Sequence, residues 1–178
     1  MASLSQTDIN ALVAKIKKFP YLVTAVLAGG TTSITGQTIT AATVSLGPLA
    51  GAPTAEPDVE TNDITLYETG ADIQAKLLTK NSVTLTIRTR NIDDAMELIK
   101  LAKKDENVYD PAYKQTITLV PITGATGEKA FTFTNAFLNP GLSFAPGEGN
   151  DPNSVTLTYE CKADASTGVP FTYATPST

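Results

Sequence analysis

The sequence predicts a mainly β protein with a β-sandwich or barrel-like core, one flanking α-helix and a short helix at the N-terminus. The chain contains 28 threonines, many of which alternate with Val, Leu, Ile or Phe, and this pattern is typical of strands. Eleven prolines and twelve glycines separate these runs. A chain of 178 residues suits one domain with its own core. We place a single β-rich domain at residues 21–163, between an N-terminal helical segment (1–20) and a C-terminal tail (164–178).

The N-terminal segment carries a helix signal. Ser5 to Asp8 approximates a capping box, and Pro20 ends the run. Apolar residues recur between them at helical spacing: Ile9, Leu12, Val13, Ile16 and Phe19. Such a stripe must be covered, either by the chain's own sheet or by a neighbouring copy.

The stretch 81–104 predicts a strand that runs into a helix. Val83, Leu85 and Ile87 alternate with polar residues and share one face. Helical spacing then begins, and it predicts the flanking helix at 92–104 with Asn91 as its N-cap. Acidic residues in the first turn and lysines in the last turn oppose the helix dipole.

The remaining strands follow from apolar alternation and from turn residues. Pro121 is expected to place its strand towards a sheet edge, and Phe131, Phe133 and Phe137 are expected to share one face. The tail either adds a short edge strand at 169–173 or is disordered. The predicted segments are a buried strand at 21–27, one or two weak strands within 31–47, an acidic hairpin at 62–80 that turns at Gly70, and strands at 113–122, 130–138, 142–146 and 154–163.

Residues 47–62 are predicted to form a long extended loop, because they contain three prolines and few apolar side chains. A loop of this length in a compact domain is usually functional or flexible. It is the best candidate for an arm that reaches another subunit. The candidate inter-subunit residues are Pro48, Leu49, Pro53, Pro57 and Val59.

Catalytic, cofactor-binding and metal-ligating residues are not predicted. The chain has no histidine, which excludes Ser-His-Asp catalysis and His-ligated metals. Its single cysteine, Cys161, excludes an internal disulfide and a Cys-based zinc site, and its phase within its strand directs it towards the core. We therefore expect neither an enzyme nor a bound cofactor. No segment reaches the roughly 20 apolar residues that a membrane-spanning helix needs.

The charge distribution is uneven. The net charge is −5, and no basic residue occurs between Lys18 and Lys76. The same stretch holds six acidic residues, Glu56, Asp58, Glu60, Asp63, Glu68 and Asp72. Two interpretations remain open: a solvated acidic loop and hairpin, or a surface that must not adhere to a polyanion.

Over residues 20–163, the order of elements resembles the tail tube proteins of tailed bacteriophages and related contractile particles. That order is a pair of strands, a Pro/Gly loop, an acidic hairpin that leads into a strand, one helix and further strands. The resemblance implies hexameric rings that stack into a tube through which DNA passes without specific binding. It also implies a sheath or tape-measure protein as a partner, and a place in the virion tail after assembly in the bacterial host cytoplasm.

For such a tube, the hairpin offers Asp63, Glu68 and Asp72 as candidate acidic residues facing the lumen. Two alternatives stay open. One is another virion structural protein, such as a tail completion, baseplate or decoration protein. The other is a surface β-sandwich adhesin or binding module.

Overall fold

The computed structural model describes residues 21–27, 33–34, 37–38, 43–65, 73–102, 109, 111–121, 129–148 and 151–174. The predicted N-terminal helix lies outside the described residues, as do the hairpin turn at Gly70 and the predicted lumen residues Glu68 and Asp72.

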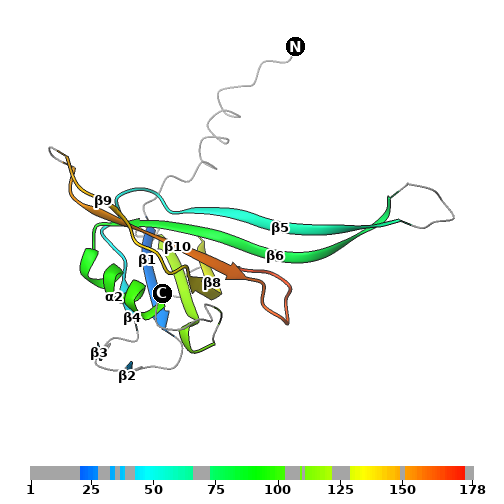
Figure 1. The fold of residues 1–178 in the computed structure, drawn as a ribbon, viewed down its shortest axis with the longest axis horizontal. Helices are drawn as coiled ribbons and strands as arrows, with labels where there is room; N and C mark the ends of the chain where they lie inside the picture. The colour runs from blue at the N-terminus through cyan, green and yellow to red at the C-terminus, as the bar shows by residue number, and fades with distance from the viewer. Residues whose placement is uncertain are drawn as a thin grey trace, which may run out of the picture.

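The described part of the chain is mainly β with a single α-helix, as the sequence predicts (Figure 1). A short 3-10 turn at Pro111–Tyr113 precedes β7. In chain order, the elements are β1 (Tyr21–Leu27), β2 (Ser33–Ile34), β3 (Gln37–Thr38), β4 (Thr43–Ser45), β5 (Thr54–Thr65), β6 (Ile73–Thr89), α2 (Ile92–Ala102), β7 (Gln115–Pro121), β8 (Ala130–Leu138), β9 (Ser143–Ala145), β10 (Ser154–Lys162) and β11 (Thr172–Ala174).

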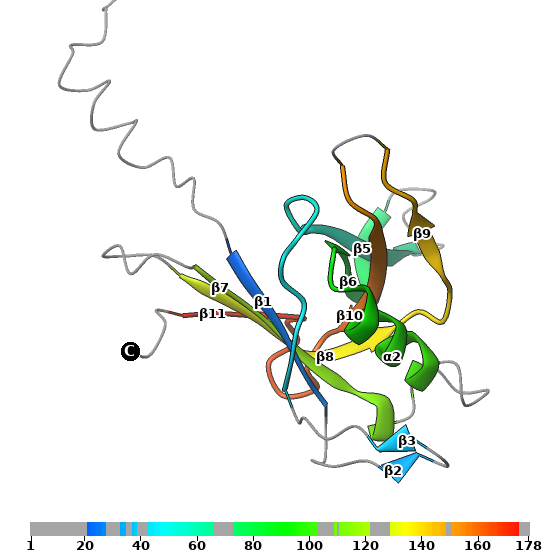
Figure 2. The same ribbon diagram turned by 90° about the vertical axis from the view of Figure 1, so that its left-hand side faces the viewer.

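One antiparallel sheet contains nine of these strands, and it curves into a barrel-like shape (Figure 2). Its main path is β4-β1-β7-β8-β10-β6-β5, with β11 beside β8 and β9 beside β10. The two ends of the path, β4 and β5, are consecutive in the chain. Residues 46–53 join them and form hydrogen bonds with both β1 and β6. Leu46 N donates to Val23 O in β1 (2.9 Å), and Ala50 N donates to Arg88 O in β6 (2.8 Å). This connection closes the sheet into a barrel-like core, as predicted.

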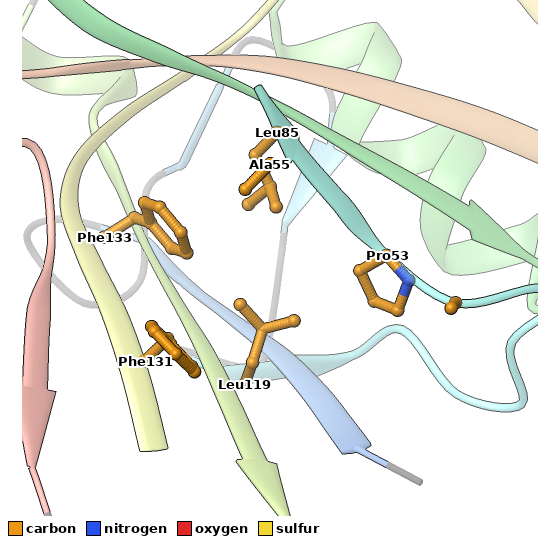
Figure 3. Close-up of a pocket in the computed structure, with 7 residues that line it drawn as sticks. Pro53, Ala55, Leu85, Leu119, Phe131 and Phe133 are labelled. Atoms are coloured by element: carbon orange, nitrogen blue, oxygen red, sulfur yellow. The ribbon is translucent and has the colours of Figure 1, made fainter. Parts of the chain in front are cut away.

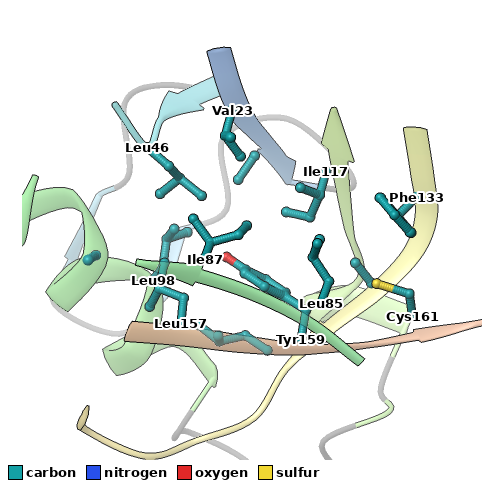
Figure 4. Packing of buried hydrophobic residues seen from close by; sticks show 14 of the residues in the cluster. Val23, Leu46, Leu85, Ile87, Leu98, Ile117, Phe133, Leu157, Tyr159 and Cys161 are labelled. Carbon is teal, nitrogen blue, oxygen red and sulfur yellow. The ribbon is translucent and has the colours of Figure 1, made fainter. Parts of the chain in front are cut away.

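The core lies inside this curved sheet (Figure 4). Alternate residues of β6 and β10 point inward, so the predicted face of Val83, Leu85 and Ile87 is confirmed. Cys161 is fully buried in the same cluster, as its phase predicts. Leu98 of α2 lies at one end of the core and Phe133 of β8 at the other.

The helix α2 forms where the sequence predicts it, although residues 103–104 lie outside the described part. Asn91 caps it, because Asn91 Oδ1 accepts a hydrogen bond from Asp94 N (3.5 Å). The helix packs against β8 and β10. Its buried stripe is Ala95, Leu98, Ile99 and Ala102.

The prediction of a loop at residues 47–62 is wrong from Thr54 onward. Residues 54–62 belong to β5, which pairs with β6 along its whole length. Proline is tolerated there because β5 is the last strand of the sheet, so that one of its edges has no strand partner among the described residues. The loop is therefore short, and the acidic hairpin is much longer than predicted.

Two further expectations are wrong. β7 is an interior strand between β1 and β8. Pro121 is tolerated because it is the last residue of β7, and pairing with β8 stops earlier, at Leu119. Phe137 does not share the face of Phe131 and Phe133. The register between β7 and β8 shifts between Gln115 and Ile117, so that three residues of β8 span two of β7 and the pleat reverses.

The tail contributes an edge strand, so the disordered alternative does not hold for the described residues. The strand β11 pairs with the first residues of β8. Before it, Asn81 Nδ2 donates a hydrogen bond to Gly168 O (2.8 Å) and ties the tail to β6. Gly168 has φ +70°, a conformation that favours glycine.

Candidate assembly surface

The β5–β6 hairpin projects far beyond the barrel (Figure 1). β10 pairs with β6 only from Ser82 to Thr89, so in the described part the first nine residues of β6 have β5 as their only sheet partner. The register shifts between Glu60 and Thr61, and Thr79 Oγ1 there donates to Glu60 O (3.1 Å). A two-stranded hairpin without further support is only marginally stable in water. This half of the hairpin therefore depends for support on the strands that anchor it in the barrel.

One face of the hairpin continues the inner face of the barrel. Pro57 lies opposite Val83, and directly opposed residues share a face. Val59 follows two residues later on this face, and Leu78 lies opposite Thr61. Val59 and Leu78 are each 52% exposed, so this apolar strip has no cover among the described residues.

The opposite face of the hairpin carries an acidic row. Glu56, Asp58 and Glu60 lie opposite Thr84, Ser82 and Lys80. Lys80 Nζ lies 2.6 Å from Asp58 Oδ2, and the pKa of Lys80 is raised chiefly by this hydrogen bond. Glu56 and Glu60 have no ion pair within the part of the chain that the structure describes.

The acidic row continues onto β10 through Glu160, which lies opposite Thr84. Glu160 Oε2 accepts a hydrogen bond from Tyr109 Oη (2.6 Å), and this bond is the main reason that the pKa of Tyr109 is raised. Lys162 Nζ lies 3.0 Å from the centroid of the Tyr109 ring, a cation–π contact. These contacts fix Glu160 at the surface beside Lys80 and Asp58.

The predicted site residues do not form one cluster. Asp63 lies on the apolar side of the hairpin and pairs with Lys76 across the strands, with Lys76 Nζ 3.6 Å from Asp63 Oδ1. Of the predicted arm, Pro48, Leu49 and Pro53 lie in the connection before β5, whereas Pro57 and Val59 lie within the hairpin.

An apolar groove opens where the hairpin leaves the barrel (Figure 3). We call it the mouth groove. It consists of two adjoining pockets of about 300 and about 270 Å³ that share Ala55, Phe131 and Phe133. The remaining lining residues are Ala52, Pro53, Pro57, Val83, Leu85, Leu119 and Phe171.

Aromatic side chains form one rim of the mouth groove. The Phe131 ring centroid lies 4.8 Å from that of Tyr173 and 6.2 Å from that of Phe171. Phe171 and Tyr173 are both exposed. Sequence reasoning missed the groove because its walls come from segments far apart in the chain, although the alternation of Phe131 and Phe133 was visible.

Among the described residues, no three His, Cys, Asp or Glu side chains lie where they could hold a metal ion. No helix in this part of the chain is long and apolar enough to cross a membrane.

No protein-family model matches this chain, and no curated protein matches it. Among solved structures, it is similar to the tube-terminating cap of the anti-feeding prophage, with a TM-score of 0.51 and 13% identity over 90% of this chain and 91% of that chain. The two chains share a fold. The chain is also similar to a chain in the structure of an extracellular contractile injection system, the PVC sheath–tube complex in the extended state. This alignment has 16% identity and a TM-score of 0.49, and it covers 89% of this chain and 94% of that chain.

Proposed function

We propose that this protein is a structural subunit of a tail tube in a bacteriophage or related contractile particle. In this role, copies assemble into rings, the rings stack, and DNA passes through the channel. The observation that carries the proposal is the hairpin, which leaves the barrel with exposed apolar side chains on both faces within the described part of the chain. Val59 and Leu78 are exposed on one face, and Ile64 and Leu77 on the other.

The charge distribution supports the same role. A channel for DNA should be acidic or neutral, because lysine and arginine would hold phosphates and slow transit. We assign Glu56, Asp58, Glu60 and Glu160 to the face that lines the channel, since they share the outer face of β5, β6 and β10. Asp63 then lies on the side that meets a neighbouring copy.

A tube-terminating cap is the second candidate, and the fold likeness to the anti-feeding prophage cap favours it. A cap forms one ring and does not polymerise, whereas a tube subunit stacks. Both roles place the protein in a particle's tail after assembly in the host, and a sheath or tape-measure protein would be a partner of the tube.

Electron microscopy of the concentrated, purified protein tests these roles. We expect rings that stack into filaments whose length grows with protein concentration. Single rings of fixed thickness would favour the cap. Monomers that persist at high concentration, both in micrographs and in light scattering, would reject both roles.

A further inference from the structure

The apolar strip of the hairpin and the mouth groove lie on one continuous face of the molecule. Pro57 of β5 is a wall of the groove, and Val59, two residues later, faces the same side. Val59 and Leu78, which form the strip, are both exposed. We propose that the strip of one copy inserts into the mouth groove of a second copy. This inference rests on the proposed function, because it names the contact through which the copies join.

The strip cannot fill the groove of its own chain. Pro57 and Val59 belong to one strand, and they lie opposite Val83 and Asn81 of β6 without a register shift between them. To reach its own groove, β5 would have to fold back within two residues and lose this pairing. The strip must therefore meet another molecule, and a second copy presents a groove of matching character.

The strip and the groove match in spacing. Along β5, the first pocket of the groove contacts Pro53 and Ala55 (Figure 3), and the second contacts Ala55 and Pro57. The two pockets thus follow each other at an interval of two residues, which is about 7 Å of strand. In the strip, Leu78 lies opposite the second residue after Val59. Two exposed apolar side chains can therefore enter two apolar pockets at the same interval.

Charge favours this face of the hairpin over the other. None of the described residues that line the groove is charged. The described charged residues on the strip's face of the hairpin are Asp63 and Lys76, which balance each other as an ion pair. The opposite face carries the acidic row, so two copies that met through it would bring like charges together. Docking through the strip therefore leaves the acidic row free, as the lining of a channel requires.

The contact joins two different surfaces, and this gives it a direction. A copy that inserts its strip into a neighbour still offers its own groove to a further copy. Such a heterologous contact repeats from copy to copy until a ring closes. The incoming hairpin would also cover the exposed aromatic residues at the rim, Phe171 and Tyr173. Aromatic side chains are enriched at interfaces between proteins.

Two variants that each lose one half of the contact test it. Leu78→Asp places a charge in the strip, and Ala55→Glu places one in the groove, at exposed positions. We expect each variant alone to associate at least about tenfold more weakly than the unchanged protein, because an unpaired charge would be buried. Mixed in equal amounts, the two should form a one-to-one dimer in analytical ultracentrifugation. One variant still has an intact groove, and the other still has an intact strip.

Matched controls carry the same change of charge on the opposite face of the hairpin. Thr54→Glu is the control for Ala55→Glu, and Asn62→Asp is the control for Leu78→Asp, all at exposed positions. Both controls should associate as the unchanged protein does, and circular dichroism checks that every variant is folded. Equal effects of a variant and its control would overturn the inference. A mixture of the two variants that stays monomeric would overturn it as well.

Cross-linking between copies gives an independent measurement. Protein with Leu78→Cys is mixed with protein that carries Ala55→Cys, and a short bis-maleimide is added. Cys161 is buried, so it does not compete for the reagent. We expect a linked dimer of the two proteins in several-fold higher yield than when Leu77→Cys replaces Leu78→Cys, because Leu77 lies on the opposite face. Equal yields from the two mixtures would contradict the contact.

The unchanged protein separates this inference from the tube role. Rings or filaments that also form from folded Leu78→Asp and Ala55→Glu proteins would leave the tube role standing and overturn the contact. Dimers that form through the contact but never close into rings would support the contact and reject the tube role. An unchanged protein that stays monomeric at high concentration would reject both.

Discussion

Tyr159 is fully buried in the core, and its hydroxyl has no hydrogen-bond partner within the described residues. A buried, unpaired hydroxyl costs about 1–3 kcal/mol, and replacing it with hydrogen removes that cost. We expect Tyr159→Phe to raise the free energy of unfolding by about 1 kcal/mol, measured by urea denaturation. The control is Tyr109→Phe, which loses the bond to Glu160 and should not stabilise. A destabilised Tyr159→Phe would mean that the hydroxyl has a partner after all.

Burial raises the pKa of the Cys161 thiol to about 12. The unfolded thiol has an ordinary pKa near 9, so between these values the folded protein holds a proton that the unfolded chain releases. Stability should therefore fall as the pH rises above about 9, with a slope of up to about 1.4 kcal/mol per pH unit from this group. Denaturation curves from pH 8 to 11 measure this slope for the protein and for Cys161→Ala. The slope should be shallower in Cys161→Ala, and equal slopes would assign the pH dependence to other groups.

Residue-level prediction worked where the pleat was regular. Cys161 faces the core because β10 alternates without a break. Phe137 does not keep the face of Phe133, because one extra residue in β8 reverses the pleat between them. The extra residue arises from pairing with β7, which is a tertiary contact. The sequence of β8 alone does not reveal it.

At the scale of elements, β6 and α2 were predictable because each has one clear period. β5 was not, since its prolines and acidic residues are those of a loop. An edge strand accepts such residues when a long neighbour provides the pairing, and β6 does so from Ile73 to Thr86. The mouth groove escaped prediction for a similar reason, because β5, β8 and the tail meet only in the fold.

The projecting half of the hairpin should be dispensable for folding and essential for assembly. Glu60 lies opposite Lys80, so residues 61–79 can be replaced by Asn-Gly, which forms a tight two-residue turn. We expect the barrel to keep its melting temperature within a few degrees, because none of the described residues in the removed stretch belongs to the buried core cluster. Light scattering should show that the variant no longer assembles. If the variant still formed rings or filaments of normal appearance, the hairpin would not be part of the assembly surface.

At the scale of the whole molecule, the acidic residues divide between faces rather than forming one patch. A Glu56→Lys/Glu60→Lys variant reverses the row on the outer face of the hairpin, and both positions are exposed. We expect normal folding, and we expect the assembled variant to retain DNA at low salt and release it as salt rises. Gel shift across a salt series measures this retention.

The matched control for charge is Asp93→Lys/Glu148→Lys, which changes the net charge equally at exposed positions elsewhere. Weak DNA retention by the control and strong retention by the hairpin variant would place the row along the channel. If the two variants retain DNA equally, total charge explains the effect and the row has no special position.

The strand β6 runs without interruption from the far end of the hairpin into the core, and α2 begins three residues after it ends. We expect β6 to transmit a force applied at the far end of the hairpin along its backbone to α2, which lies on the opposite side of the barrel. The points of the hairpin that yield are its two register shifts, one between Glu60 and Thr61 and the other between Ile64 and Thr65. In a stacked particle, a displacement of one copy would therefore be transmitted to the barrel of the next copy.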